Sequence, residues 1–257
     1  MKFIVAIPVY NCEKQISRVI NQLTPNILKS IDKVIIINNQ SKDNSVKVAL
    51  ETINKKRHNS KIEVFSNDEN YNLGGSHKVA FLFGEKERAD YVAILHGDDQ
   101  AKASELLKMI KVAQYEEYPD AVLGSRFMHE SSLRGYSLTR ITGNKALNLI
   151  FTLVTFRKTK DLGSGLNLFK LSSLENHAYL GFEDSMTFNI DILLYYYSKK
   201  SKIVFAPITW EEKDQVSNAK NFKIAASILR KLFLWRFGKL NWNKNKRPEE
   251  YSSKRIY

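Results

Sequence analysis

The first 125 residues alternate between two hydrophobic patterns, and this alternation limits the fold more than any other feature. Short apolar runs such as 34–37 and 91–95 have the continuous hydrophobicity of strands buried on both faces. Between such runs, apolar residues recur at helical spacing. We expect strands at 3–8, 34–37, 62–65, 91–95 and 121–124, and helices at 13–23, 45–53, 76–87 and 104–114. The sequence therefore predicts an α/β fold with a mainly parallel central sheet flanked by helices and a Rossmann-like N-terminal half.

The net charge of +13 is concentrated at the C-terminal end of the chain. Residues 220–257 hold eleven Lys or Arg and two Glu, so this segment carries +9 and residues 1–219 carry only +4. We therefore predict one domain over 1–219 and a basic, aromatic C-terminal helix and tail over 220–257. A uniformly basic protein would indicate nucleic acid as a partner, which we do not expect from this uneven distribution.

The C-terminal segment has two possible roles. Phe222, Leu229 and Phe233 recur at helical spacing, and Trp235 and Trp242 follow among basic residues. This combination is typical of a helix on an anionic membrane surface, but also of a helix packed on the domain with a solvated basic end. The most apolar long stretch, 147–156, is too short to span a membrane. We expect a cytoplasmic protein, peripheral at the inner face of the membrane.

Polar groups follow every predicted strand. Because the carboxyl ends of parallel strands meet at one edge of the sheet, ligands bind there. The segment His96-Gly97-Asp98-Asp99-Gln100 is the densest in carboxylate and suits a divalent cation with its phosphates, although a plain polar turn has the same composition. The first strand leads into PVYN rather than GxGxxG, which argues against a Rossmann dinucleotide site.

Six motifs then occur in an order that resembles family 2 glycosyltransferases of the GT-A fold, most closely the branch of dolichyl-phosphate mannose synthase. They are IPVYNCE (7–13), VIIINNQSKDNS (34–45), NLGGSHK (72–78), HGDDQ (96–100), DAVLGSRF (120–127) and DLGSGLNLFK (161–170). The resemblance implies a nucleotide-sugar donor carrying GDP, UDP or dTDP. It also implies Mg²⁺ or Mn²⁺ and transfer with inversion.

The resemblance also assigns the donor-binding residues. It places Pro8, Tyr10 and Asn11 around the base and ribose, and Asn39 where the family usually has an Asp that contacts the nucleoside. Two glycines before a helix, beginning at Gly74, can present backbone amides to an anion. The donor-binding candidates are Pro8, Tyr10, Asn11, Glu13, Asn39, Gly74, Lys78 and Asp99.

Asp98 matches the last carboxylate of the family's DxD motif and is the main candidate for holding the metal. Gln100 takes the amide position of DxDxQ, and His96 replaces the first Asp. His96 either ligates the metal or hydrogen-bonds beside it. We favour the hydrogen bond, because Mg²⁺ prefers oxygen ligands, whereas Mn²⁺ would tolerate an imidazole.

The remaining catalytic candidates depend on the acceptor. Arg126 would suit a diphosphate or an acceptor phosphate, and its alternative is an exposed surface arginine. Glu183 and Asp184 resemble the position of the base in relatives that act on hydroxyls, although Asp184 can equally cap the following helix, which we expect at 186–197. Lys220 lies where relatives that act on phosphates often carry a lysine.

Three functions remain open from the sequence. The first is metal-dependent, inverting transfer of a sugar to a lipid phosphate of the polyprenyl-phosphate type. The second keeps the donor chemistry but transfers to a hydroxyl of a cell-surface polysaccharide or glycolipid, with Glu183 or Asp184 as base. The third is a non-catalytic protein that binds nucleotide or nucleic acid.

Overall fold

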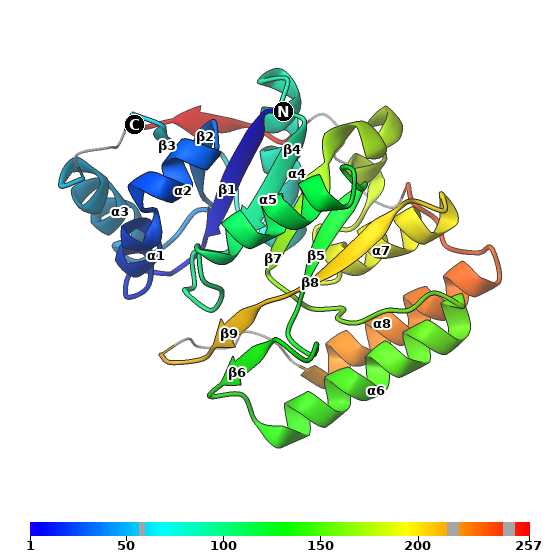
Figure 1. Cartoon of the computed structure of the whole chain (residues 1–257). Coiled ribbons are helices and arrows are strands. Elements are labelled where there is room, and N and C mark those ends of the chain that lie inside the picture. The colour runs from blue at the N-terminus through cyan, green and yellow to red at the C-terminus, as the bar shows by residue number, and fades with distance from the viewer. Residues whose placement is uncertain (57–59, 215–220, 244–249) are drawn as a thin grey trace.

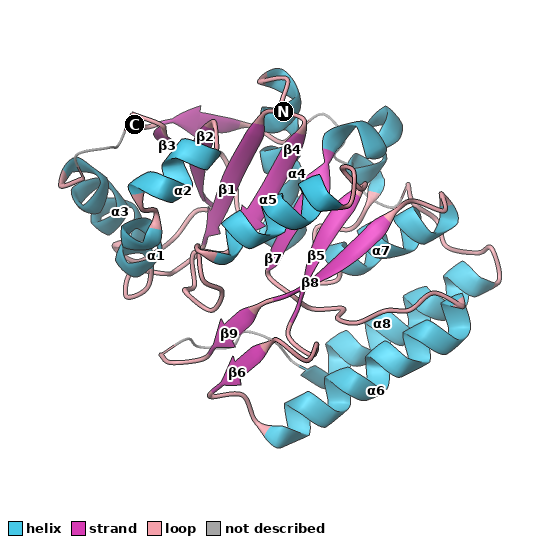
Figure 2. Cartoon of the chain, viewed as in Figure 1, coloured by secondary structure: helices cyan, strands magenta, loops and turns pink. Residues whose placement is uncertain are grey.

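The computed structural model describes residues 1–56, 60–214, 221–243 and 250–257, and its centre is one large, mostly parallel sheet (Figures 1 and 2). The strand order is β10-β3-β2-β1-β4-β7-β5-β8. The strands are β1 (Phe3–Val9), β2 (Lys33–Asn38), β3 (Ile62–Asn67), β4 (Tyr91–Leu95), β5 (Ala121–Ser125), β7 (Leu166–Lys170), β8 (Ile203–Pro207) and β10 (Ser253–Arg255). All five predicted strands are present, so the predicted fold class is confirmed.

Helices cover both faces of the sheet because side chains of each central strand alternate between two cores. In β1, Val5 and Ile7 join one core with α1, α2, α3 and α5, whereas Ile4 and Ala6 join the other with α4, α6, α7 and α8. The helices are α1 (Ile16–Gln22), α2 (Pro25–Ser30), α3 (Ser45–Asn54), α4 (Asn72–Lys86), α5 (Glu105–Tyr115), α6 (Leu138–Thr155), α7 (Phe188–Ser198) and α8 (Asn221–Arg236).

The sheet departs from a simple parallel order at β7. This strand lies between β4 and β5 and runs antiparallel to both, with Leu168 opposite Ala93 and Val122. Leu168 and Phe169 belong to the two opposite cores, so β7 is buried on both faces like the parallel strands. β8 extends the sheet beyond β5 in parallel register.

The C-terminal segment is built into the domain at two places. Ile228 and Leu232 of α8 are buried, and α8 lies beside α6 below the sheet (Figure 1). β10 then pairs antiparallel with β3 at the edge of the sheet. One face of the predicted helix is therefore packed on the domain, while the predicted boundary at residues 219 and 220 falls outside the described residues. Among the helices of the described part, none is long and apolar enough to cross a membrane.

A small second sheet extends the molecule at the carboxyl end of β5. It pairs β6 (Ser132–Arg134) with β9 (Thr209–Glu211) in parallel, and α6 follows β6 directly (Figure 2). Trp210 of β9 forms a bridge with Ala101, and Glu211 N donates to Gln100 O over 2.9 Å. β9 therefore lies against the segment that follows β4.

Candidate functional site

The 96–100 turn follows β4 at the carboxyl end of the parallel strands, as the sequence predicts. Gly97 N donates to Pro8 O over 3.0 Å, which joins the turn to the end of β1. A Cβ atom at Gly97 would lie 2.8 Å from Val9 Cγ2 and 3.1 Å from Pro8 O. Only glycine permits this close approach. Gly97 therefore allows the 96–100 turn to lie directly beside the end of β1.

Asp98 is a half-buried carboxyl at the centre of this turn. Burial raises the pKa of Asp98, while the neighbouring His96 acts in the opposite direction. Gln100 N donates to Asp98 Oδ1 over 3.2 Å. A carboxylate that is costly to ionise in place gains from a nearby cation, which makes this position suitable for a metal ion.

A divalent cation at Asp98 would need ligands from the substrate. Within the described ranges, no three His, Cys, Asp or Glu side chains gather closely enough to hold a metal ion by themselves. Mg²⁺ at phosphate sites is commonly bound by one or two carboxylates, with phosphate oxygens and water completing its coordination. The residues of this turn fit an ion that binds together with a nucleoside diphosphate.

Asp99 contacts two side chains of α1. Its backbone has a φ of 59°, and its side chain is 1% exposed. Arg18 Nε donates to Asp99 Oδ2 over 2.7 Å, and Gln22 Nε2 donates to Oδ1 over 2.6 Å. These contacts place Asp99 in the attachment of α1 to the turn, and its predicted contact with the donor stays a prediction.

His96 makes contact with a second histidine that the sequence did not single out. His96 Nε2 lies 3.3 Å from Nε2 of His77, a fully buried residue of α4. Burial lowers the pKa of both imidazoles, most strongly that of His77, so both rings are neutral near neutral pH. The predicted choice for His96 between metal ligand and hydrogen-bonding neighbour therefore depends on His77.

Asn39 uses its whole side-chain amide to hold neighbouring loops together. Its Nδ2 donates to Asn70 Oδ1 over 2.9 Å and to Asn72 O over 3.2 Å. Its Oδ1 accepts from Asn67 Nδ2 and from Tyr71 N, both over 2.9 Å. An aspartate could not donate the first two bonds. The asparagine in this motif therefore links β2 to the segment before α4, and its predicted contact with the nucleoside stays a prediction.

The other residues predicted at the base and ribose lie in the loop after β1. Tyr10 is partly exposed, and Asn11 has a φ of 53°. Asn11 Oδ1 accepts from Lys42 N over 2.8 Å, and Glu13 Oε2 accepts from Asn44 N over 3.1 Å. The loops after β1 and β2 therefore support each other beside the end of β1.

Lys78 joins the start of α4 to the loop before α7. Its fully buried ammonium donates to Asp184 Oδ1 over 2.8 Å, to Tyr251 OH over 3.0 Å, and to the carbonyls of Leu180 and Phe182. Gly74 N, predicted to bind an anion, donates to Asp184 O over 2.9 Å. A Cβ at Gly74 would lie 2.8 Å from Glu183 O, so the glycine permits this close packing.

Glu183 and Asp184 are each ion-paired with a buried lysine. Lys231 Nζ of α8 lies 3.0 Å from Glu183 Oε2 and 2.5 Å from Asp191 Oδ2 of α7. Asp184 pairs with Lys78, as described above. Both carboxylates predicted as a catalytic base are therefore bound to cations of the protein.

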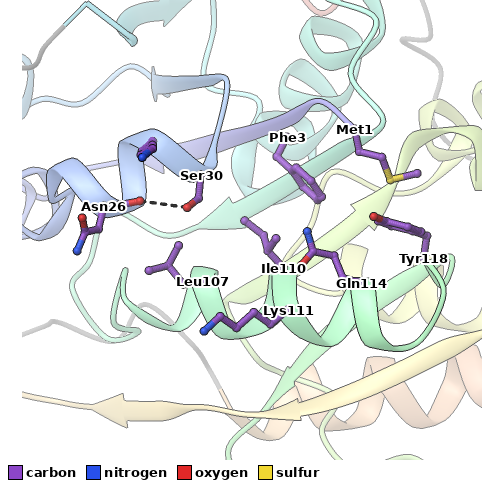
Figure 3. Close-up of a pocket in the computed structure, with 10 residues that line it drawn as sticks. Met1, Phe3, Asn26, Ser30, Leu107, Ile110, Lys111, Gln114 and Tyr118 are labelled. Carbon is purple, nitrogen blue, oxygen red and sulfur yellow. Dashed lines mark hydrogen bonds between the residues drawn. The ribbon is translucent and has the colours of Figure 1, made fainter.

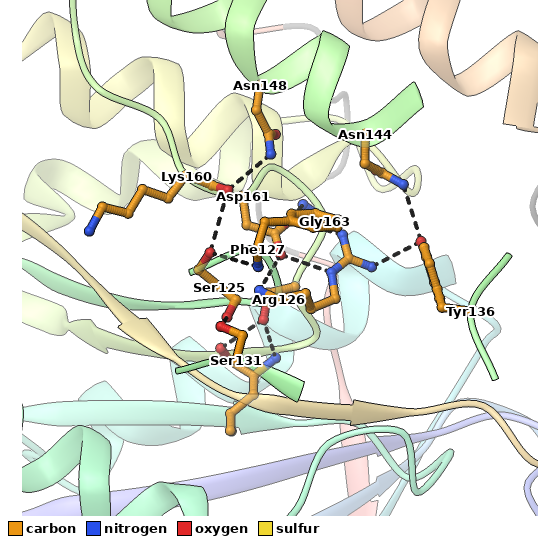
Figure 4. Close-up of polar contacts among 12 residues, drawn as sticks. Ser125, Arg126, Phe127, Ser131, Tyr136, Asn144, Asn148, Lys160, Asp161 and Gly163 are labelled. Carbon is orange, nitrogen blue, oxygen red and sulfur yellow. Dashed lines mark hydrogen bonds and ion pairs between the residues drawn. The ribbon is translucent and has the colours of Figure 1, made fainter. Parts of the chain in front are cut away.

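Arg126 is buried, which excludes the predicted alternative of an exposed surface arginine. Figure 4 shows the polar contacts of its guanidinium. Its Nε and Nη2 each donate to an oxygen of Asp161 over 2.8 Å. Its Nη1 donates to Tyr136 OH over 3.2 Å, and Trp210 lies against the guanidinium. Asp161 neutralises the charge of Arg126, so an acceptor phosphate would meet an arginine already oriented by a carboxylate.

Glu212 and Arg140 also reach the site, although no sequence motif marks them. Gln100 Nε2 donates to Glu212 Oε1 over 3.2 Å, and Arg140 Nη1 donates to both Glu212 oxygens over 2.6 and 2.7 Å. This chain of contacts connects the 96–100 turn with α6. Gln100 and Glu212 are 112 positions apart, so the linear sequence holds no local signal of their contact. The predicted acceptor contact Lys220 lies outside the described residues.

A separate cavity of about 510 Å³ lies at the opposite end of β1 (Figure 3). It is lined by Met1 and Phe3 at the start of the chain and by side chains of α2 and α5, among them Asn26, Ile110 and Lys111. These residues surround the amino end of β1, whereas Pro8 and the 96–100 turn lie at its carboxyl end. The cavity is therefore distinct from the candidate site.

Comparison with known proteins shows which family this chain resembles. The model of Glycosyl transferase family 2 matches residues 4–177. A curated relative, the UDP-N-acetylglucosamine–dolichyl-phosphate N-acetylglucosaminyltransferase of Methanococcus voltae, is 28% identical over 180 residues, or 66% of this chain and 69% of the relative.

Solved structures share the fold at low sequence identity. Glucosyl-3-phosphoglycerate synthase from Mycobacterium tuberculosis, solved with Mn²⁺, uridine-diphosphate-glucose and glycerol 3-phosphate, has a TM-score of 0.64 at 13% identity, covering 93% of this chain and 80% of that one. S. aureus TarS 1-349 has a TM-score of 0.56 at 18% identity, covering 91% of this chain and 66% of that one. These likenesses confirm the GT-A fold.

The family match extends from β1 to beyond β7 and includes the 96–100 turn and the polar strand ends. It covers well over half of the chain, and the sheet places the matched motifs at one edge. The chain therefore belongs to glycosyl transferase family 2 and is a glycosyltransferase of the GT-A fold that uses a nucleotide-sugar donor.

Proposed function

We propose that this glycosyltransferase moves its sugar, with inversion, to a lipid phosphate of the polyprenyl-phosphate type. The observation that carries the proposal is the ion pairing of Asp184 with Lys78 and of Glu183 with Lys231. Each carboxylate is held by an ammonium of the protein, so it must leave that ion pair before it can take a proton from an acceptor. A phosphate acceptor is already anionic and needs no base, whereas a hydroxyl acceptor does. The dolichyl phosphate named in the Methanococcus voltae relative is an acceptor of this class.

In the proposed reaction, Asp98 would hold Mg²⁺ or Mn²⁺ against the diphosphate of the donor, and the Mn²⁺ in the mycobacterial neighbour supports this assignment. When bound, the ion supplies a Lewis acid that offsets the charge developing on the departing nucleoside diphosphate. Gln100, fixed by Glu212, would orient the turn. Arg126, held by Asp161, would orient the acceptor phosphate for attack on the anomeric carbon.

The acceptor can be tested directly. Incubation with UDP-, GDP- and dTDP-sugars and polyprenyl phosphate should give a lipid-linked sugar. The matched control is the corresponding polyprenol, which lacks the phosphate and should give no product. Efficient transfer to polyprenol or to a glycan hydroxyl, with none to polyprenyl phosphate, would contradict the proposal.

A double variant distinguishes the two acceptor classes at the residue level. Glu183→Gln with Asp184→Asn removes both carboxylates while keeping their size and hydrogen-bonding groups. For a phosphate acceptor, the transfer rate should fall by less than about tenfold. For a hydroxyl acceptor it should fall by about 10²–10⁴-fold, the usual contribution of a general base. Nucleotide binding, measured alongside, must remain for the comparison to hold.

We also propose that the exposed faces of α6 and α8 lie on an anionic membrane surface. On α6, Leu149, Leu153 and the C-cap residue Phe156 are more than half exposed. Phe233 and Phe237 at the end of α8 are also more than half exposed. The two helices lie side by side (Figure 1), and Arg236 lies 5.9 Å from the Phe156 ring. An exposed apolar surface of this kind marks an interaction site.

The basic residues around this surface favour anionic lipid as its partner. Lys223, Arg230, Arg236 and Lys239 are exposed on or just after α8, and Lys145 and Lys158 flank the apolar face of α6. Lysine and arginine near an interface attract anionic headgroups, while Phe and Leu enter the acyl boundary.

A non-catalytic role as a nucleic-acid binder, the third function left open by the sequence, is set aside by the family match.

Vesicle binding tests this surface. Phe233→Ser with Phe237→Ser should weaken binding to vesicles containing anionic phosphatidylglycerol by about tenfold, because two apolar side chains no longer enter the interface. Tyr115→Ser removes an aromatic that is 86% exposed on α5 and serves as the matched control, with binding unchanged. Equal binding of the wild type to neutral phosphatidylcholine, or equal loss in both variants, would count against the assignment.

A further inference from the structure

His77 contacts the one side chain of the candidate metal site whose role the sequence left open. It is 0% exposed, and its ring packs edge-on against Phe188, with centroids 5.4 Å apart. On its other side, His77 Nε2 lies 3.3 Å from His96 Nε2. His77 therefore has packing on one side and His96 on the other.

The contact between the two imidazoles occupies Nε2 of His96. A neutral imidazole has one N–H donor and one acceptor nitrogen. Across an N···N distance of 3.3 Å, one ring donates its proton and the other accepts it with its lone pair. His77 Nδ1 has no hydrogen-bond partner among the described residues. A buried N–H without a partner is rarer than an unpaired acceptor, so His77 carries its proton on Nε2 and donates it to His96 Nε2. His96 then carries its own proton on Nδ1, and neither of its nitrogens offers a lone pair to the site.

The opposite edge of the His96 ring is confined as well. A Cβ atom at Gly165 would lie 2.8 Å from His96 Nδ1, 3.2 Å from its Cε1 and 3.0 Å from Trp210. The backbone before β7 and the Trp210 ring therefore pack beside this edge. Residue 165 therefore packs on the second edge of the ring, while the bond to His77 on the first edge fixes the direction of Nε2.

We propose that His77 is a positioning residue that keeps His96 from ligating the divalent ion through Nε2, so that Asp98 and the donor phosphates supply the ion with oxygen ligands. An all-oxygen site accepts Mg²⁺ as well as Mn²⁺, whereas an imidazole ligand would favour Mn²⁺. His77 thereby determines the metal preference of this enzyme. The inference rests on the proposed metal-assisted use of a nucleoside diphosphate.

His77→Phe provides the test, because it keeps an aromatic ring against Phe188 and removes both ring nitrogens. The probe is whichever of UDP, GDP and dTDP binds best, titrated with Mn²⁺ or Mg²⁺ by calorimetry. We expect the apparent Kd for Mn²⁺ to fall by about tenfold in the variant, the size typical of changes beside a metal ligand, and that for Mg²⁺ to stay within about twofold. The gain should vanish in His77→Phe with His96→Phe, and His77→Gln should behave as the wild type.

Pulsed electron paramagnetic resonance of bound Mn²⁺ gives a readout independent of activity. Coupling to a histidine ¹⁴N nucleus should be absent in the wild type and present in His77→Phe. Histidine coupling in the wild type would overturn the inference even if the variant failed to fold. Intact metal-dependent nucleotide binding in the wild type, with no change in His77→Phe, would overturn the inference alone. Absence of metal-dependent binding in the wild type would overturn the proposed metal use and the inference with it.

Discussion

Asp98→Asn should lower the rate of sugar transfer by about a thousandfold. The carboxylate is the side chain of the 96–100 turn best suited to hold the divalent ion, and its burial already disfavours the charged form when no cation is present. Lewis-acid stabilisation of a departing diphosphate contributes several kcal/mol, and about 4 kcal/mol corresponds to three powers of ten in rate. The measurement is kcat with saturating donor and acceptor, together with the metal dependence of nucleotide binding.

The adjacent carboxylate provides a matched control. Asp99 is one position away but contacts Arg18 and Gln22. Asp99→Asn should therefore reduce the stability of the fold, while any nucleotide binding that it retains should still depend on the metal ion. If Asp98→Asn kept more than about a tenth of wild-type transfer, or if both variants lost metal dependence equally, the assignment of the ion to Asp98 would be wrong.

Lys231→Met should reduce the free energy of unfolding by about 3–5 kcal/mol, the usual cost of leaving a buried charge without its partner. Lys231 is 3% exposed and lies between Asp191 of α7 and Glu183 in the loop before it. Its loss leaves two carboxylates facing an apolar side chain. Urea denaturation measures the change. Lys223→Met, on an exposed position of the same helix, should change stability by less than about 0.5 kcal/mol.

The stability lost in Lys231→Met should also depend on pH. Burial already raises the pKa of Asp191, and Lys231 is the main influence that lowers it. The folded protein already binds a proton at Asp191 more tightly than the unfolded chain does, and loss of Lys231 raises the folded-state pKa of Asp191 further. Stability of the variant therefore falls as pH rises above the ordinary range of an aspartate, until the folded-state pKa is passed. The difference from wild type should be larger at pH 8 than at pH 5, and adding Asp191→Asn should restore part of the stability. A difference that grows toward low pH would contradict this account.

The sequence predicted those strands and helices whose apolar residues form a continuous run or recur at helical spacing. The β-branched run in β2 and the helical spacing in α5 depend only on neighbours in sequence, so both were found within a few residues of their ends. β7 was missed as a strand, because Asn167 and Lys170 interrupt its short apolar run, and only its place between β4 and β5 buries it on both faces. The helix α2, which begins at a proline, is too short to show a period.

For the 96–100 turn as well, the sequence determined some properties and the tertiary structure decided others. By itself, the sequence determined an α/β sheet, a row of polar strand ends and a carboxylate cluster after β4, because hydrophobic period and residue type are local properties. Only the tertiary structure decided what each polar group contacts: Asp99 meets Arg18, Gln100 meets Glu212, and His96 meets His77. Two adjacent aspartates look alike in sequence, yet Asp99, with a backbone φ of 59°, is bound to two side chains of α1, which Asp98 is not shown to contact. Hydrogen bonds and ion pairs form between atoms that folding brings together, and that proximity is absent from the order of residues along the chain.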